Sequence, residues 1–155
     1  MPTRYRGAPE EVRALNTYIK LTRAAESVLA RTTAHLSAHD LTHTQFAVLE
    51  ALYHLGTLSQ VVLARKLLKS TGNMTTVLQN LEKRGLITRE RDAHDQRVMQ
   101  VTITAAGRRL VECVLPAHVR GIVDALSVLS AGEQETLGAL CRRLGRQQAA
   151  DTQEA

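Results

Sequence analysis

Small polar side chains recur along one face of a predicted helix that follows Ser70. If Met74, Leu78 and Leu81 face a core, the opposite face carries hydroxyls, amides and one cation. Such groups can donate to phosphates and pair with base edges. A face that is merely solvated, the competing interpretation, would carry more Glu and Lys, because these are better helix formers than Thr and Asn. The pattern therefore predicts a DNA-reading surface made of Asn73, Thr75, Thr76, Gln79, Asn80 and Lys83.

The two ends of this helix carry further polar groups. Ser70 and Thr71 offer hydroxyls beside the unpaired N–H groups of a helix N-terminus, a combination that suits a phosphate. At the other end Glu82 and Arg84 flank the predicted surface and are expected to stay in solvent. We therefore assign backbone anchoring to Ser70, Thr71 and Lys83, and base reading to the amides and hydroxyls between them.

Three arginines and a carboxylate follow in a predicted β-hairpin. Residues 86–91 and 97–103 alternate in polarity or are rich in β-formers, and the polar segment 92–96 joins them. A long cation on a projecting turn can enter the narrow minor groove, where the potential is most negative. Asp95 is placed to hold the Arg97 guanidinium by a charge-assisted pair. The hairpin residues expected to contact DNA are Arg89, Arg91, Asp95 and Arg97.

The charge and composition favour a polyanionic partner. The net charge is +5, and between residues 65 and 97 eight basic residues oppose four acidic ones. Two distant cysteines, a basic N-terminus without a following apolar segment, and the lack of a long apolar run favour a soluble, cytoplasmic protein that uses no membrane. There is no P-loop, GxSxG or HExxH motif, so we expect neither an enzyme nor a cofactor.

The elements that must position these residues are mainly helical. Pro9 and two following glutamates suit the start of a long helix over 9–38. The capping residues Thr42, Ser59 and Ser70 predict three shorter helices. Gly85 should end the helix that Ser70 starts, and a short strand is expected near Leu58. Thr104 should start a helix over 105–129 that is bent at Pro116, and a capping box at 130–133 should start the last helix. The last helix should point Leu137, Leu140, Cys141 and Leu144 inward.

Several short motifs, in this order, resemble the multiple antibiotic resistance regulator (MarR) family. They are the run 41–49, then Leu58-Ser59-Gln60 and Leu63-Ala64, the runs 70–75 and 81–89, Asp92 with Asp95-Gln96-Arg97, and Ile103-Thr104-Ala105-Ala106-Gly107. The resemblance departs at one position, because the wing of the family usually ends Asp-Arg-Arg. The segments 49–56 and 67–70 look nearer to the quinone-responsive and catechol-responsive branch.

The resemblance implies a mainly α fold (an α+β winged helix) within one domain, 1–155. A winged helix-turn-helix DNA-binding lobe would occupy 41–103, helical segments 9–38 and 105–148 would form a dimerisation region, and 149–155 would be a flexible tail. It also implies a homodimeric repressor that reads a pseudo-palindrome in double-stranded DNA. Leu and Val stripes on the long helices support a dimer independently, because a core of this size could not bury them alone.

The resemblance further implies a small aromatic or phenolic effector, bound between the dimer helices and the DNA-binding lobe. Polar or aromatic residues on elements that could meet there are Tyr18, Arg23, His35, His39, Tyr53, His54 and His118. Capping and surface solvation are the competing roles for each of them. The sequence does not choose among these candidates.

Two other kinds of site remain open alternatives. His35, His39 and His43 recur at a spacing of four, but the break predicted at 40–42 separates them and we expect no metal. Cys113 and Cys141 lie among apolar residues, which favours buried, inert thiols over an oxidant or electrophile switch. A constitutive activator or architectural DNA-binding protein with the same fold is the remaining alternative.

Overall fold

The computed structural model describes residues 3–151, with side chains as far as residue 145. The elements in chain order are α1 (Pro9–Thr33), the 3-10 helix η1 (Ala34–His39), α2 (His43–Leu55), β1 (Leu58–Ser59), α3 (Gln60–Lys66), α4 (Thr71–Lys83), β2 (Ile87–Arg91), β3 (Met99–Ile103), α5 (Ala105–Leu126) and α6 (Ala131–Asp151). The predicted order and the mainly helical fold class are confirmed.

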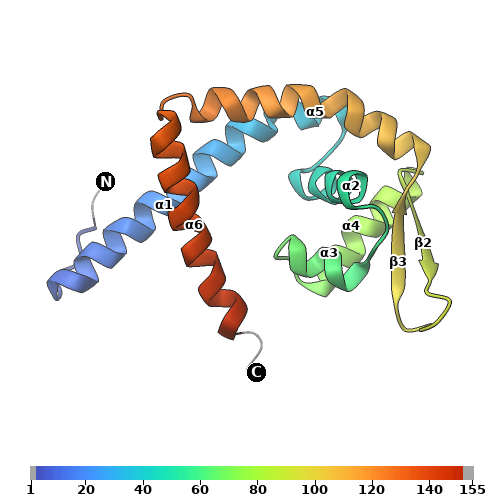
Figure 1. Ribbon diagram of the computed structural model, residues 1–155, viewed down its shortest axis with the longest axis horizontal. Coiled ribbons are helices and arrows are strands. Elements are labelled where there is room, and N and C mark those ends of the chain that lie inside the picture. Colours follow the sequence, from blue (N-terminus) through green and yellow to red (C-terminus); the bar gives the residue numbers. More distant parts are fainter. Residues whose placement is uncertain (1–2, 152–155) are drawn as a thin grey trace.

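Two parts of different shape make up the chain. The helices α2, α3 and α4 and the hairpin β2–β3 form a compact lobe, while α1, α5 and α6 extend away from it as long rods (Figure 1). The helix α5 runs from the base of the hairpin back over α1, and α6 turns away from its far end. Chain segments from both ends of the sequence therefore leave the lobe on the same side.

The long first helix ends earlier than the sequence predicts. Regular α-helix stops at Thr33, and the chain continues as η1 until Asp40 takes a left-handed conformation with φ 52°. The backbone N–H of Asp40 bonds back to the carbonyl of Ser37, which closes the helical run. Leu36, in η1, is almost fully buried in the core of the lobe. The first helix thus tightens where it must insert a side chain into the lobe.

Side-chain caps set the starts of the three lobe helices, as predicted. Thr42 accepts from the N–H of Gln45 and Ser59 from that of Val62. Ser70 accepts from the N–H of Asn73, and Gly85 follows α4 with a φ of 67° that favours glycine. These local contacts fix where α4 begins and ends, and hence which of its residues face outward.

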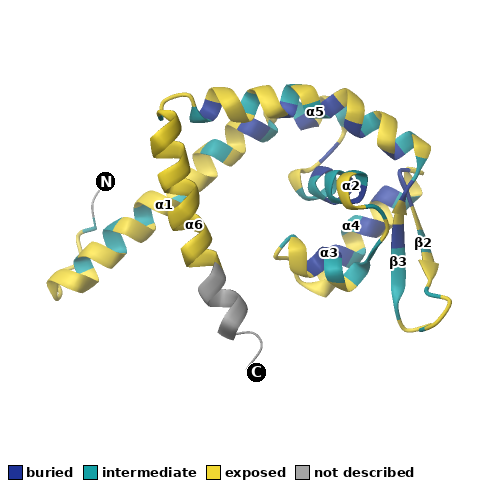
Figure 2. Cartoon of the chain, in the orientation of Figure 1, coloured by how far each residue is buried: buried dark blue, intermediate teal, exposed yellow. Residues whose placement is uncertain are grey.

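A small antiparallel sheet closes the lobe, with strand order β1-β3-β2. Ile87 lies opposite Ile103, and Arg91 lies opposite Met99 nearer the hairpin tip. The buried residues concentrate in the lobe and at its junction with α5 (Figure 2). Residues of all three lobe helices join in one core, and the largest of these are Phe46, Leu49, Leu52, Leu63, Met74, Leu78 and Leu81.

The start of α5 is fastened to the turn between α4 and β2. The hydroxyl of Thr104 donates to the carbonyl of Gly85 at 2.7 Å and also caps α5 through the N–H of Gly107. At Gly107 the backbones approach so closely that a Cβ would lie 2.2 Å from the carbonyl oxygen of Leu86. The helix then continues through Pro116.

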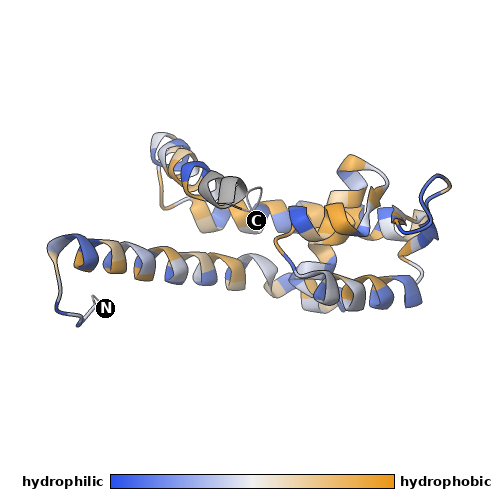
Figure 3. Ribbon diagram, turned by 90° about the horizontal axis from the view of Figure 1, so that it is seen from below, coloured by the Kyte–Doolittle hydropathy of each residue, from blue (hydrophilic) through white to orange (hydrophobic). Residues whose placement is uncertain are grey.

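Much of the apolar surface of the long helices is exposed in the single chain. We predicted that the apolar residues of α6 point inward, and this is wrong for the chain alone, because Leu137, Leu140 and Leu144 are 42–55% exposed. They line a groove of about 900 Å³ against α1. Apolar residues also recur along α1 (Figure 3). Of the helices that the structure describes, none alone is long and apolar enough to span a membrane, and the one pair that qualifies by length and composition, α5 with α6 up to Gly145, is bent by 101°.

Candidate nucleic-acid interface

The outward face of α4 presents most of the polar residues that the sequence singled out. Thr76, Gln79, Asn80 and Lys83 are exposed, on the side opposite the buried Met74, Leu78 and Leu81. Ser70, Thr71 and Asn73 are exposed at the N-terminal end of the same helix. Exposed hydroxyls, amides and a cation therefore lie on one continuous helix face, within reach of bases and phosphates.

Thr75 differs from its neighbours on this face. It is half-buried, donates its hydroxyl proton to the carbonyl of Thr71, and accepts from the side-chain amide of Gln60 at 2.7 Å. Gln60 is the first residue of α3, so this bond joins the two helices of the helix-turn-helix. From the sequence we noted Gln60 only as part of a family motif, because a side-chain bond across 15 residues leaves no local pattern.

Glu82 and Arg84, which flank the polar face of α4, were expected to stay in solvent; Arg84 is exposed and the Glu82 side chain is 38% exposed, but both also have partners within the protein. Glu82 accepts from Arg89 of β2 (Nε to Oε2, 3.0 Å), and this hydrogen bond together with the positive charge lowers the pKa of Glu82. The side chain of Arg89 is only 18% exposed. Arg84 donates to backbone carbonyls of the η1–α2 turn. Arg89, which we expected on the DNA, is thus committed to joining α4 to the hairpin.

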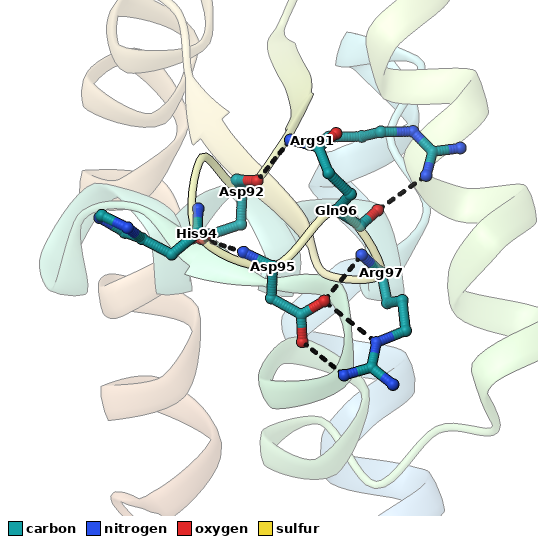
Figure 4. Close-up of polar contacts among 6 residues, drawn as sticks. All are labelled: Arg91, Asp92, His94, Asp95, Gln96 and Arg97. Atoms are coloured by element: carbon teal, nitrogen blue, oxygen red, sulfur yellow. Dashed lines mark hydrogen bonds and ion pairs between the residues drawn. The ribbon is translucent and has the colours of Figure 1, made fainter.

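The hairpin tip is organised around Asp92 (Figure 4). One carboxylate oxygen accepts from the N–H groups of His94 and Asp95, and the other accepts from the side-chain amide of Gln100 at 2.8 Å. These bonds, that of Gln100 foremost, lower the pKa of Asp92, so the carboxylate stays ionised and keeps accepting. From the sequence we noted Asp92 only as part of a motif, and the structure shows that it shapes the turn.

The two arginines that flank this turn differ in their partners. Arg91 donates to the carbonyl of Gln96 at 2.7 Å, which spans the tip. The Arg97 guanidinium pairs with Asp95, as predicted, and the Arg97 side chain is 91% exposed (Figure 4). One edge of the Arg97 guanidinium is therefore held by a carboxylate, and the remainder of the side chain faces solvent. The residue lies at the end of a hairpin that projects from the lobe.

The residues predicted to line a ligand site separate into three places. Tyr18 and Arg23 are exposed on α1, and Tyr18 lies beside Tyr5. Tyr53 and His54 stack edge to face on α2, where the Tyr53 hydroxyl is 3.5 Å from Glu112 of α5. His35 and His118 form the third place, with His39 half-buried further along η1.

His35 and His118 meet where η1, α2 and α5 pack together. Their ring centroids are 5.4 Å apart, and the His118 ring lies edge to face with Phe46 at 4.8 Å. Nδ1 of His118 is 3.1 Å from the carbonyl oxygen of Thr32 and must donate, because a carbonyl only accepts. Nε2 of His35 is buried and has no hydrogen-bond partner among the described residues. Burial, followed by the charges of His118 and His39, lowers the pKa of His35.

The two cysteines are exposed, and a turn divides the three histidines that recur at a spacing of four. Cys113 and Cys141 are both exposed in the chain, which corrects the expectation of buried thiols; neither residue fills the core beside it. The left-handed turn at Asp40 separates His43 from His35 and His39. Within the described part of the chain, no group of three or more His, Cys, Asp or Glu side chains could hold a metal ion.

An exposed polar recognition helix, a supporting helix bonded to it and a projecting hairpin with a presented arginine define a winged helix-turn-helix DNA-binding protein. The model of the MarR family matches residues 41–99, which span most of the lobe. The transcriptional regulator MhqR of Bacillus subtilis is 35% identical over 133 residues, covering 86% of this chain and 92% of MhqR. The uncharacterized regulator YkoM of the same organism is 36% identical, over 88% of this chain and 89% of its own. The chain belongs to the MarR family of DNA-binding transcriptional regulators.

Solved structures agree with this assignment. BpsR of Bordetella bronchiseptica superimposes with a TM-score of 0.77 at 27% identity, covering 83% of this chain and 98% of BpsR. The DNA binding of BpsR is regulated by 6-hydroxynicotinic acid. MepR of S. aureus, in complex with DNA, has a TM-score of 0.75 at 26% identity, with 84% and 96% covered. NadR in complex with 4-hydroxyphenylacetate has a TM-score of 0.72 at 26% identity, with 93% and 97% covered.

Proposed function

We propose that the protein is a homodimeric repressor that binds a pseudo-palindromic operator through two copies of the lobe. The observation that carries the proposal is the joint presentation of the free polar face of α4 and the oriented Arg97 on one lobe. The α4 residues are suited to the major groove and Arg97 to the adjacent minor groove. One such lobe covers a half-site, so a dimer would cover two.

The dimer itself is supported by the apolar surface that one chain leaves uncovered. Leu21 and Leu29 on α1, Val123 on α5 and Leu140 on α6 are between 39% and 61% exposed. Burying such surface in a second copy is favourable by about 25 cal/mol per Å². We propose that residues 9–38 and 105–148 form this interface, as the family resemblance implied. Light scattering on the purified protein should give twice the mass of one chain.

Selection from random double-stranded DNA tests the proposal as a whole. The protein should enrich one palindrome whose half-sites lie about one helical turn apart, roughly 34–36 Å. Enrichment of a single half-site would contradict the dimeric arrangement. No enrichment at all, with binding retained, would favour the architectural alternative over a sequence-specific repressor.

We further propose that a small aromatic or phenolic acid releases the protein from its operator. The DNA binding of BpsR is regulated by 6-hydroxynicotinic acid, NadR has been solved in complex with 4-hydroxyphenylacetate, and both superimpose on most of this chain. The two clusters His35–His118 and Tyr53–His54 are the candidate contacts, since both lie where α5 packs on the lobe helices. The operator complex is titrated with each of the two acids and, for comparison, with benzoate, which lacks the hydroxyl group. At least one of the two hydroxylated acids should release DNA at a lower concentration than benzoate does. Equal insensitivity to all three would remove this class of effector.

The exposure of both cysteines keeps an electrophile-sensing alternative open. A thiol that solvent reaches can react with a quinone or a peroxide, whereas a buried one cannot. Treatment with benzoquinone should then release the wild-type protein from DNA. One of the variants Cys113→Ser and Cys141→Ser, the one that lacks the sensing thiol, should stay bound. Release that persists in both variants would exclude this mechanism.

A further inference from the structure

Arg84 links the end of the recognition helix to a distant turn of the chain. It is the residue that follows α4, and its guanidinium donates from Nη1 to the carbonyl oxygen of Asp40 at 2.6 Å and from Nη2 to that of His39 at 3.0 Å. The two partners precede Arg84 by 44 and 45 residues. The contact is therefore tertiary, and it joins α4 to the junction between η1 and α2.

The two carbonyls are available because a helical run ends there. The chain is helical from Pro9 through η1 to His39, and Asp40 then turns it with a φ of 52°. The last carbonyls of a helix have no partner within it, and the negative end of the helix dipole favours a cation. A guanidinium can satisfy two adjacent carbonyls at once because its donors are fixed in one plane. Arg84 thus caps the α1–η1 arm from outside.

This junction is where the long arm meets the lobe. Leu36 of η1 is 1% exposed and belongs to the lobe core, so the arm and the lobe share packing at this point. The recognition helix packs mainly on α2, α3 and β2, which are all elements of the lobe. Arg84 extends the support of α4 from the lobe to the arm.

We propose that Arg84 is a positioning residue, which fixes the orientation of α4 against the α1–η1 arm and so sets the separation of the two recognition helices in the dimer. This inference rests on the proposed function. Two guanidinium nitrogens are already engaged by backbone carbonyls, so Arg84 acts on DNA through α4 and not as a phosphate ligand.

The experiment compares the wild type with Arg84→Gln and Arg84→Lys on three DNA probes. The probes are the palindromic duplex that the wild type selects from random DNA, and the same duplex with one or two base pairs inserted between its half-sites. Affinity is measured at several salt concentrations. Lys83→Gln is the matched control for charge: it removes the neighbouring exposed cation, so it should weaken binding and lower the salt slope, but it leaves the bonds of Arg84 to the η1–α2 turn intact. Circular dichroism checks that each variant is folded.

If Arg84 positions α4, Arg84→Gln binds the selected palindrome about tenfold more weakly, a typical size for such a coupling. Its salt dependence stays as in the wild type, and the inserted base pairs cost it less affinity than they cost the wild type. Arg84→Lys shows the same loss of spacing preference, because an ammonium is a single point of donation and does not reproduce the planar fork. Arg84→Lys also keeps the positive charge. If Arg84→Gln does not fold, the spacing preference of Arg84→Lys therefore decides whether Arg84 positions α4. Lys83→Gln keeps the spacing preference.

Two results would overturn the proposal. Wild-type affinity and spacing preference in both Arg84 variants would show that the bridge positions nothing. A salt slope lowered by about one unit in Arg84→Gln would make Arg84 a phosphate contact. Failure of the wild type to select any palindrome would instead refute the proposed function, so the two failures are distinguishable.

Discussion

Nε of Arg97 lies 3.1 Å from Oδ1 of Asp95 at the tip of the hairpin, while 91% of the Arg97 side chain stays exposed. An exposed pair of this kind adds little to stability, because solvent screens it and holding two side chains costs entropy. The benefit is orientation, since the guanidinium is already extended from the turn before DNA arrives. Asp92 supports the same arrangement from behind by accepting from the N–H of Asp95.

Arg97→Ala should therefore weaken operator binding without unfolding the protein. Losing one well-placed contact costs about 1–3 kcal/mol, or roughly tenfold to a hundredfold in affinity. Asp95→Asn should cost less, because the guanidinium remains but is no longer held. His94→Ala is the control, because it changes an exposed side chain in the same turn. Fluorescence anisotropy at physiological salt measures all three, and unchanged affinity in Arg97→Ala would refute the assignment of the wing.

Lys83→Ala should reduce the salt dependence of DNA binding. Lys83 is exposed at the end of the polar face of α4, where an ammonium can neutralise one phosphate. Each neutralised phosphate contributes about one unit to the slope of log affinity against log salt. Titrations between low and physiological salt give the slope. Equal slopes for the wild type and Lys83→Ala would mean that Lys83 remains solvated in the complex.

Gly107→Ala should destabilise the fold. A Cβ at this position would lie 2.2 Å from the carbonyl oxygen of Leu86 and 2.8 Å from Cγ1 of Ile103, so the start of α5 would have to move away from the lobe. Overpacking of this kind costs about 1–3 kcal/mol of unfolding free energy. Gly132→Ala is the matched control, because a Cβ there meets no atom within 4 Å. Urea denaturation should separate the two variants, and equal midpoints would contradict the close approach.

Much of the fold could be predicted because its signals are local. Thr42, Ser59 and Ser70 cap helices through bonds to residues three positions away, and such spacings are visible in the sequence. The salt bridge of Asp95 with Arg97 spans two positions and was predicted for the same reason. The part of the site that depends on local contacts was therefore within reach of sequence analysis.

The errors arose where the deciding partner is distant in sequence. The ion pair of Arg89 with Glu82 and the bonds of Arg84 to the η1–α2 turn leave no local pattern in the sequence. The prediction that Leu140 of α6 points inward was also wrong for the single chain, because a pattern of apolar residues does not say whether the same chain or another covers them. Tertiary contact, not local propensity, decides these positions.

Leu68→Asn should stabilise the protein. Leu68 lies in the turn of the helix-turn-helix with a φ of 51°, in the left-handed region, and is 85% exposed. A left-handed conformation costs an ordinary residue about 1–2 kcal/mol, and Asn tolerates it better. The gain should be about 1 kcal/mol at most, since little packing is lost. Val61→Asn, at an exposed position inside the α3 helix, should give no gain. Thermal melting distinguishes the two, and a lower melting temperature for Leu68→Asn would contradict the argument.

The stability of the protein should fall as the pH decreases through the ordinary histidine range, from about 7.5 towards 5.5. Burial and the neighbouring His118 and His39 lower the pKa of His35, while an unfolded chain would protonate it near its ordinary value. Although His43 is an exposed residue, partial desolvation and the charges of Lys69 and His118 also lower its pKa, against the opposing charge of Glu50.

In this pH range the unfolded state thus binds more protons than the folded one, so acidification favours unfolding and the lost stability returns above the ordinary histidine pKa. His35→Phe keeps a ring in contact with His118 but cannot be protonated, so its urea midpoint should depend less on pH than that of the wild type. His54→Gln, on the exposed side of α2, should keep the wild-type dependence. If His35→Phe and the wild type lost stability equally on acidification, other groups would have to bind the proton, since the buried Nε2 of His35 would then have no part in it.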